Sequence, residues 1–246
     1  MSDVLTRKTI YAHGSLGLPL AVIGYPLSIW IPAHYSGGLG ISLAAVGTIL
    51  MLARLTDVVT DPIMGEISDR WHTPFGRRKP WVVAGSAVMM LGVYNLFMPE
   101  PGVGMVYFLV WLAVFFIGST MIALPHRAWG AELSPDYHQR ARVTAAREIY
   151  VLVGLMVAAA VPMIIEIRAD GAAVGEVFVT LWKDAIGAFS GDFGDKQVVD
   201  RATLTGPVLA GLAWTIILVL PVCALITTGL VREPAEQVTA ERRPTF

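Results

Sequence analysis

The chain has 246 residues, of which 55% are hydrophobic and only 15% are charged. Because soluble domains carry about 25% charged residues, this composition excludes a water-soluble enzyme and a disordered chain. The formal net charge of −1 argues against a nucleic-acid-binding protein, and the single cysteine, Cys223, excludes a disulfide framework or a thiolate metal cluster. A multi-spanning membrane protein remains.

Six apolar segments approach or exceed the length of helix, about 20 residues, that crosses a bilayer. We therefore predict an all-α membrane protein with six transmembrane helices, over residues 11–35, 41–65, 81–98, 105–129, 147–167 and 206–231. Several of these segments contain proline, which membrane helices tolerate where neighbouring helices satisfy the released carbonyl groups. A β-barrel would need alternating apolar and polar residues, and no such alternation is sustained in the sequence.

Lysine and arginine residues predict the orientation of these helices. They occur in the N-terminus, in the link between the second and third helices, in the link between the fourth and fifth, and in the tail, which all fall on one side. The positive-inside rule assigns that side to the cytoplasm. We expect a cytoplasmic N-terminus (1–10), a transmembrane bundle (11–231) and a cytoplasmic tail or linker (232–246), in the inner membrane of a bacterial cell.

A long segment on the opposite side, 169–205, has apolar residues at helical spacing. They are Val174, Val177, Phe178, Leu181, Trp182, Ala185, Ile186 and Phe189. We interpret this segment as an amphipathic helix lying flat in the outer interface. It is either a surface anchor that bridges the fifth and sixth helices, which is the simpler interpretation, or a lid over a substrate entrance.

Charged residues occur in the second predicted helix, where lipid would be expected. Asp57 and Asp61 are four residues apart and Arg54 is three residues before Asp57, so all three project from one face of the helix. Each ionised group in mid-bilayer costs about 2.5–3.5 kcal/mol, so three unpaired charges would cost about 8–10 kcal/mol. Thr60 lies beside them, and Pro62 leaves the carbonyl of Val58 without its usual donor. Such an oxygen-rich set suits a hard cation or a carried proton; the alternative is an internal salt bridge between Arg54 and one aspartate that only fixes helix packing.

A charged cluster follows this helix, around the turn that Gly76 permits. For Asp69, Arg70 and Arg77 we favour a cytoplasmic ion-pair network whose pairs form in one conformation and break in the other. For Arg78 and Lys79 we favour a simple positive-inside anchor.

The fourth and fifth helices contribute further polar residues. Thr120 alone would be a helix-packing hydroxyl group, and Arg147 is either a cytoplasmic flank or a hydrogen-bonding fork that points into a central cavity. His126 and Arg127 lie next to Pro125. No catalytic triad, phosphate-binding loop or zinc motif is visible, so an enzyme is not expected.

Two stretches of the sequence resemble a known family. The first runs Arg54-x-x-Asp57-x-x-x-Asp61-Pro62-x-x-Gly65-x-x-Ser68-Asp69-Arg70 and continues as Gly76-Arg77-Arg78-Lys79-Pro80-Trp81; the second runs from Ala128-Trp-Gly-Ala-Glu132-Leu-Ser-Pro-Asp136-Tyr through Arg140, Arg142 and Arg147. Both resemble the glycoside–pentoside–hexuronide:cation symporters, the melibiose-permease group of the major facilitator superfamily. The resemblance implies a half-domain built as a 3+3 inverted repeat, and a rocking carrier in which cation binding drives the uptake of a sugar-like solute.

The resemblance also implies roles for individual residues. Asp57, Thr60, Asp61 and Thr120 match the positions that bind the coupling cation, with Asp57 and Asp61 as Na⁺ ligands if the carrier uses sodium. Thr60 stands where the melibiose carriers have an amide, which leaves Na⁺ and H⁺ both open. The ion-pair or gating set is Arg54, Asp69, Arg70 and Arg77.

On the solute side, Arg147 matches the arginine that contacts sugar in this family, and Tyr25, His126 and Arg127 are further candidate contacts. Two carboxylates that read sugar hydroxyl groups in the melibiose carriers appear here as Pro19 and Ala123, so a galactoside is not supported. Because His126 and Arg127 would add positive charge, an acidic sugar such as a uronate or a sulfated glycoside is the conjecture.

Family members have twelve helices, and this chain has six. We therefore expect a cation-coupled symporter for a sugar or sugar-derived solute, or the N-terminal half of one. The alternative is a non-transporting fragment or scaffold that needs a second six-helix chain; a channel is weakly supported because no selectivity-filter motif is repeated. The expected partners are the solute, the coupling cation (Na⁺ or H⁺), membrane lipid and a second half, without a cofactor or a nucleic acid.

Overall fold

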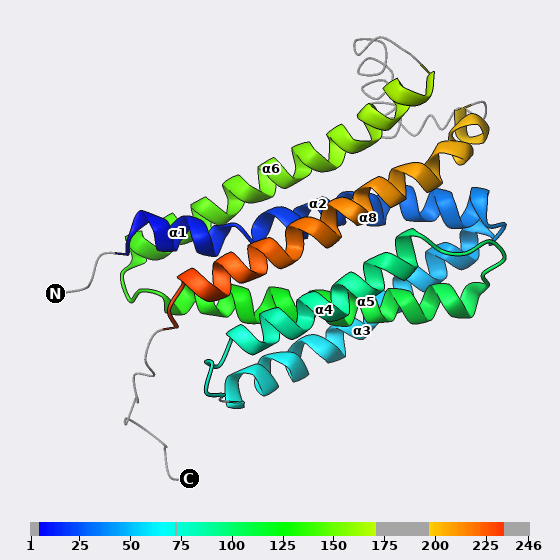
Figure 1. Ribbon diagram of the computed structural model, residues 1–246. Helices are drawn as coiled ribbons and strands as arrows, with labels where there is room; N and C mark the ends of the chain where they lie inside the picture. The colour runs from blue at the N-terminus through cyan, green and yellow to red at the C-terminus, as the bar shows by residue number, and fades with distance from the viewer. Residues whose placement is uncertain (1–4, 72, 171–196, 234–246) are drawn as a thin grey trace.

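The computed structural model describes residues 5–71, 73–170 and 197–233, and these residues are almost entirely helical (Figure 1). Within them, six helical stretches are long and apolar enough to cross a membrane. The prediction of an all-α protein with six membrane-spanning helices is confirmed. The helices are α1 (Arg7–Gly14), α2 (Gly17–Ala33), η1 (His34–Gly38), α3 (Leu43–Arg70), α4 (Lys79–Phe97), α5 (Met105–Glu132), α6 (Tyr137–Asp170) and α8 (Gln197–Leu230).

The first predicted span is not one continuous helix but the series α1, α2 and η1. The helix breaks after Gly14 because Pro19 has no N–H group to offer the carbonyl of Ser15. The Ser15 hydroxyl group turns back instead and donates to the carbonyl of Ala12, 2.8 Å away. At the other end, η1 is a short π-helix that begins two residues after Pro32.

Several helices extend beyond the apolar segments, because polar residues continue or cap their ends. The α6 helix begins at Tyr137, ten residues before the predicted start at 147. Its first turn is capped by Asp136, whose Oδ1 accepts hydrogen bonds from the backbone N–H groups of His138 (2.6 Å) and Gln139 (3.4 Å). Likewise, α3 continues past 65 to Arg70.

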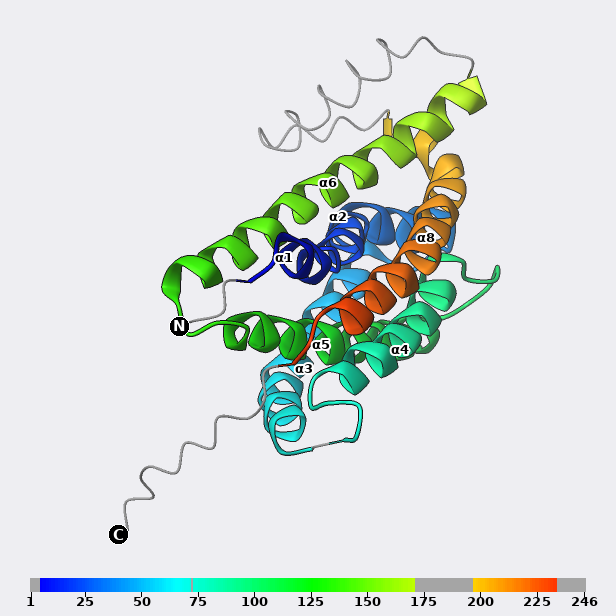
Figure 2. The ribbon, with the colours of Figure 1, turned by 60° about the vertical axis from the view of Figure 1, so that its left-hand side comes forward.

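The helices pack in the spatial order α6, α2, α8, α4, α5 and α3, so that α3 and α6 lie at opposite edges of the bundle (Figures 1 and 2). Glycine permits the closest contacts. A Cβ atom at Gly92 of α4 would lie 2.8 Å from the Cα atom of Phe115 of α5, and one at Gly154 of α6 would lie 2.4 Å from the carbonyl oxygen of Leu18 of α2. Small residues at these points let the backbones approach closely, as helix association in membranes requires.

One end of the bundle carries most of the charged residues, and we call it the charged end. There α1 begins, α3 leads into α4, α5 leads into α6, and α8 ends (Figure 1). At the opposite end, Tyr35 of η1 donates a hydrogen bond to the carbonyl of Leu96 (3.0 Å) and stacks on Phe108. The amphipathic helix predicted within 169–205 lies mostly outside the described residues, as does the tail after residue 233.

Candidate cation and solute sites

The face of α3 that carries the predicted cation ligands is turned toward α5. Asp57, Thr60 and Asp61 are all half-buried. The buried hydroxyl group of Thr120 on α5 donates a hydrogen bond to Oδ1 of Asp61, with 3.1 Å between the oxygens. The structure therefore places all four residues on two helices in direct contact, and Thr120 touches an aspartate rather than serving only as a packing hydroxyl group.

Asp57 lacks the partner that a structural salt bridge would require. Its Oδ1 atom is buried and has no hydrogen-bond partner among the described residues. Arg54 lies with its guanidinium carbon 5.5 Å from the ring centroid of Phe116, and it forms no salt bridge in the part of the chain that the structure covers. The internal ion pair considered as the alternative is absent from this conformation, and a buried carboxylate oxygen remains available to a positive ion.

The chemistry of this donor set fits a small hard cation or a proton. Two carboxylates and two hydroxyl groups supply oxygen, and the carbonyl of Val58 has no helical donor because Pro62 follows four residues later within α3. Within the described residues, no group of three or more His, Cys, Asp or Glu side chains gathers in one place. The set therefore offers oxygen ligands, which Na⁺ shares with other hard ions, rather than the nitrogen and sulfur ligands of transition metals.

A cavity of about 280 Å³ lies between α2, α5 and α6. Arg147 lines this cavity, so its position agrees with the interpretation as a fork that points into a cavity. Its Nε and Nη2 atoms donate to Oε1 of Glu148. The lining residues are Gly17, Leu20, Ala21, Ala123, His126, Arg127, Arg147, Glu148 and Val151. The side chain of Tyr25 is outside the described part of the structure.

His126 does not lie in the environment that a positively charged contact would need. Its side chain is 1% exposed, and its Nε2 atom lies 2.9 Å from the backbone carbonyl oxygen of His13. The ring stacks on the ring of His13 with centroids 4.1 Å apart. The expectation that His126 adds positive charge is therefore corrected, because a buried imidazole stacked on another imidazole resists a charge.

At the charged end, the ion-pair network centres on a residue that we had interpreted as an anchor. The side chain of Arg78 is 5% exposed and forms salt bridges of 2.7 Å with both Asp69 and Glu132. Arg77 also pairs with Glu132 at 2.7 Å, and Arg70 pairs with Glu66 one turn earlier on α3. The structure thus brings Asp69, Arg77 and Arg78 together, and it places Arg54 elsewhere.

Glu233, just after α8, is a further member of this network that sequence reasoning missed. Its carboxylate accepts hydrogen bonds from the backbone N–H groups of Arg77 (2.6 Å), Arg78 (2.9 Å) and Lys79 (2.8 Å), at the N-terminus of α4. A carboxylate there compensates the helix dipole. Gly76, at φ +120°, makes this contact possible, since a Cβ atom would lie 2.7 Å from the carboxylate.

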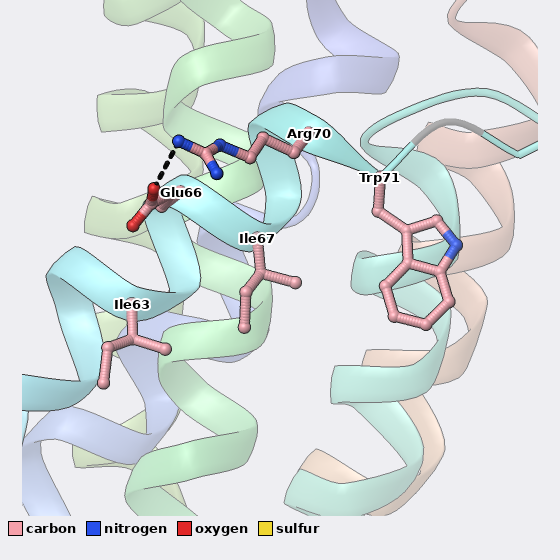
Figure 3. Close-up of a pocket in the computed structure, with 5 residues that line it drawn as sticks. All are labelled: Ile63, Glu66, Ile67, Arg70 and Trp71. Carbon is pink, nitrogen blue, oxygen red and sulfur yellow. Dashed lines mark ion pairs between the residues drawn. The ribbon is translucent and has the colours of Figure 1, made fainter.

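A larger hollow of about 720 Å³ lies on the outer side of α3 near the charged end (Figure 3). Figure 3 shows the Glu66–Arg70 ion pair beside Ile63 and Ile67, with Trp71 across the hollow. None of the candidate cation ligands lines it, and the side chains of Arg70 and Glu66 are 79% and 60% exposed. The smaller cavity, which arginine and histidine side chains line, is therefore the candidate solute site.

Comparison with known proteins identifies the family of this chain. The family described as MFS/sugar transport protein matches residues 11–245. The uncharacterized symporter YnaJ of Bacillus subtilis is 26% identical over 208 residues, which cover 81% of this chain and 44% of the relative. A glucuronide carrier protein homolog of Escherichia coli is 25% identical over 154 residues, covering 61% and 34%. The sodium-dependent lysophosphatidylcholine symporter 1 of Gallus gallus is 26% identical over 157 residues, covering 63% and 29%.

The chain spans less than half of the length of these relatives. The match of the family nevertheless extends over nearly all of the chain, including both candidate sites and the charged end. With six helices able to cross a bilayer, the chain is a multi-pass membrane protein. It belongs to the MFS/sugar transport protein family and, within the major facilitator superfamily, to the symporters of the glycoside–pentoside–hexuronide type that its motifs resemble.

Proposed function

We propose that this chain forms the cation- and solute-binding half of a secondary active symporter. The coupling ion is Na⁺ or H⁺, and the solute is a sugar or a sugar derivative. The two termini are placed on the cytoplasmic side of the inner membrane, and the chain acts as a transporter rather than as an enzyme. The single observation that supports the proposal best is the buried, unpartnered Oδ1 atom of Asp57 beside the Asp61–Thr120 hydrogen bond.

Binding of a cation would relieve an unfavourable charge arrangement. Two ionised carboxylates one helical turn apart repel each other, and the cost of burying them rises as the surroundings become less polar. A cation or a proton between them removes that repulsion. The nearest arginine on the same helix lies over an aromatic ring instead. The two carboxylates therefore favour binding of a positive ion, and a change in their surroundings would favour its release.

The α5 helix connects the proposed cation site with the proposed solute site. Thr120, Ala123 and Arg127 lie at helical spacing on one face of α5. Thr120 reaches the cation ligands, while Ala123 and Arg127 line the cavity, about 5 Å and about 10 Å further along the helix axis. Occupancy of the cation site and the position of α5 are therefore coupled, and the cavity wall moves with α5. This relationship supports symport, in which each ligand favours binding of the other.

The cavity lining indicates the solute class better than the relatives' names do, because those names carry different solutes, a glucuronide and a lysophosphatidylcholine. The cavity presents two arginines, Arg127 and Arg147, against one carboxylate, Glu148. A cavity lined by an excess of one positive charge suits a polar solute with one acidic group, such as a uronate. Arg147 is already bonded to Glu148, so Arg127 is the cation that remains for such a group.

The second candidate is a half that folds but does not transport until another six-helix chain joins it. On this alternative, the polar face of α3, α5 and α6 would be completed by the partner chain. The two candidates make the same prediction for binding and differ in transport.

The test measures solute binding and uptake by the purified chain in proteoliposomes. The panel contains neutral sugars and uronates, with an inward gradient of Na⁺ or of protons. We expect cation-dependent binding, which Asp57→Cys and Asp61→Cys abolish although both variants insert normally. Binding without uptake supports the half that requires a partner, and equal binding with and without both cations in wild type and variants refutes the symporter. Stronger uptake of neutral sugars than of uronates would end the acidic-sugar proposal alone.

A further inference from the structure

We propose that His126 is a neutral hydrogen-bond acceptor for a hydroxyl group of the solute, and that the backbone carbonyl of His13 sets its tautomer. The inference rests on the proposed function, because it concerns the cavity between α2, α5 and α6. It assigns to His126 a role opposite to the positively charged contact that the sequence had suggested.

The hydrogen bonds between the two histidines determine where the protons lie. Nε2 of His126 is 2.9 Å from the carbonyl oxygen of His13, and Nε2 of His13 is 3.2 Å from the carbonyl oxygen of His126. A carbonyl oxygen can only accept, so each Nε2 must carry the hydrogen. In a neutral imidazole the other nitrogen, Nδ1, is then a bare acceptor.

The surroundings favour the neutral ring. A second proton on either ring would place a charge against a stacked imidazole whose centroid is 4.1 Å away, with both side chains at most 2% exposed. The charged groups that line the adjoining cavity are Arg127 of α5 and Arg147 and Glu148 of α6, and Arg147 is paired with Glu148. Two arginines against one carboxylate oppose a further positive charge.

The Nδ1 atoms of His13 and His126 differ in their position relative to the cavity. Nδ1 of His13 is fully buried and has no hydrogen-bond partner among the described residues. His126 lines the cavity, and among the described residues no hydrogen bond to its Nδ1 atom is found; its bond to His13 uses Nε2. Besides the Glu148 carboxylate, which is bonded to Arg147, this cavity is therefore lined by a residue with an uncharged acceptor, Nδ1 of His126.

A donor and an acceptor that line the same cavity can together bind hydroxyl groups of a solute. Arg147 donates to an oxygen of the solute, while Nδ1 of His126 accepts from an O–H group. Ala123 lines the same cavity and offers no side-chain acceptor. The acceptor is therefore supplied without a negative charge, which leaves room for a solute that is itself acidic. A site of this kind rejects an analogue that lacks the hydroxyl group, because the acceptor would be left unpaired.

The first arm of the test needs no solute. The full chain is labelled with ¹⁵N-histidine in detergent micelles, and the spectrum is assigned by comparison with His126→Gln. We expect His126 in the neutral form with hydrogen on Nε2. Hydrogen on Nδ1, or a charged ring at neutral pH, would overturn the inference whether or not the protein binds a sugar.

The second arm measures binding of the 4-nitrophenyl glycosides of glucose, xylose and glucuronic acid by calorimetry. His126→Gln keeps a donor toward His13 but removes the Nδ1 acceptor, and should weaken binding about 3- to 10-fold. His126→Asn, which returns an oxygen near the Nδ1 position, should recover part of the loss. His13→Phe is the matched control, because it replaces the stacked imidazole with a ring that has no nitrogen but keeps the backbone carbonyl that holds His126.

The outcomes separate the two proposals. If His126→Gln binds the glycosides as tightly as the wild type, the role of His126 is overturned. The same holds if His13→Phe weakens binding as much as His126→Gln does. Both outcomes leave the symporter proposal standing. If the wild-type chain binds none of the glycosides in Na⁺ or at acidic pH, both proposals are overturned. A further comparison uses a monodeoxy glycoside, which lacks one hydroxyl group. If the wild type binds it more weakly than the parent glycoside, while His126→Gln binds the two equally, the acceptor role is supported directly.

Discussion

The hydroxyl group of Thr120 on α5 donates a hydrogen bond to Oδ1 of Asp61 on α3, over 3.1 Å. This bond joins the two helices at the level of the acidic pair, while Oδ1 of Asp57 remains without a partner in the described residues. A cation that binds the aspartates would therefore contact both helices. If the acidic pair binds a cation as proposed, Thr120 would link ion binding to the relative position of α3 and α5.

Replacing Thr120 tests this link. Thr120→Val removes the hydroxyl group from a buried position at nearly constant volume, and should weaken cation binding about 3- to 10-fold, because one hydrogen-bonding ligand is lost. Thr120→Ser keeps the hydroxyl group and should change affinity by less than about 2-fold. The measurement is the concentration of Na⁺ or H⁺ that gives a half-maximal increase in thermal midpoint. If the half-maximal cation concentration is the same for Thr120→Val and Thr120→Ser, the hydroxyl group has no role in cation binding and serves only helix packing.

Arg78 should be the most important cation for stability at the charged end. It is 5% exposed and bridges Asp69 and Glu132, whose side chains are 57% and 37% exposed. Because these partners are partly solvated, Arg78→Gln should lower the free energy of unfolding by about 1–3 kcal/mol rather than by the larger cost of breaking a fully buried pair. Thermal unfolding in detergent measures the change. Glu66→Gln, which breaks an exposed pair on α3, serves as the control and should cost less than about 0.5 kcal/mol.

Glu233 should hold the α3–α4 turn against the end of α8. Its carboxylate accepts three backbone N–H groups at the start of α4, in line with the helix dipole. Glu233→Gln should therefore cost about 0.5–2 kcal/mol and expose the turn, so that trypsin cleaves after Arg77, Arg78 or Lys79 faster than in the wild type. Glu100→Gln, at the opposite end of the molecule, should leave cleavage unchanged. Equal rates for the two variants would show that Glu233 contributes nothing to order in the turn.

The close contact of α2 with α6 should depend on Gly154. A Cβ atom there would lie 2.4 Å from the carbonyl oxygen of Leu18, a distance that requires the backbone to shift. Gly154→Ala should lower stability by about 1–3 kcal/mol and reduce solute binding, because α2 and α6 form two walls of the cavity. Gly47→Ala, where a Cβ atom meets nothing within 4 Å, should be neutral or stabilising. A Gly154→Ala protein as stable as Gly47→Ala would contradict the packing described here.

The sequence predicted the parts of the fold that depend on hydrophobic length. Six spans were expected and six are present, because a bilayer demands about 20 apolar residues whatever their order. Their ends were less well predicted, since polar turns such as the one that Asp136 caps continue a helix beyond its apolar part. Pro19 indicated a break in the first span, but the sequence did not predict that α1 would end at Gly14.

The candidate sites show the same division between local and long-range information. Spacing alone placed Asp57 and Asp61 on one face, because that relationship lies within a single helix. It did not predict that Arg78 rather than Arg54 joins the ion pairs, or that Glu233 caps α4. The contact of Arg78 with Glu132 joins residues 54 positions apart, and its contact with Glu233 joins residues 155 positions apart. His13 and His126, 113 residues apart, could be paired only once α1 and α5 were seen in contact.

The most direct test of the central claim is a cation titration of the wild-type chain and the double variant Asp57→Asn/Asp61→Asn. NaCl and acid are added separately, with choline chloride as the ionic-strength control, and tryptophan fluorescence reports the response. We predict a saturable response to Na⁺ or to H⁺ in the wild type that is absent from a folded double variant. The same response in both proteins would contradict the assignment of the acidic pair as the cation site.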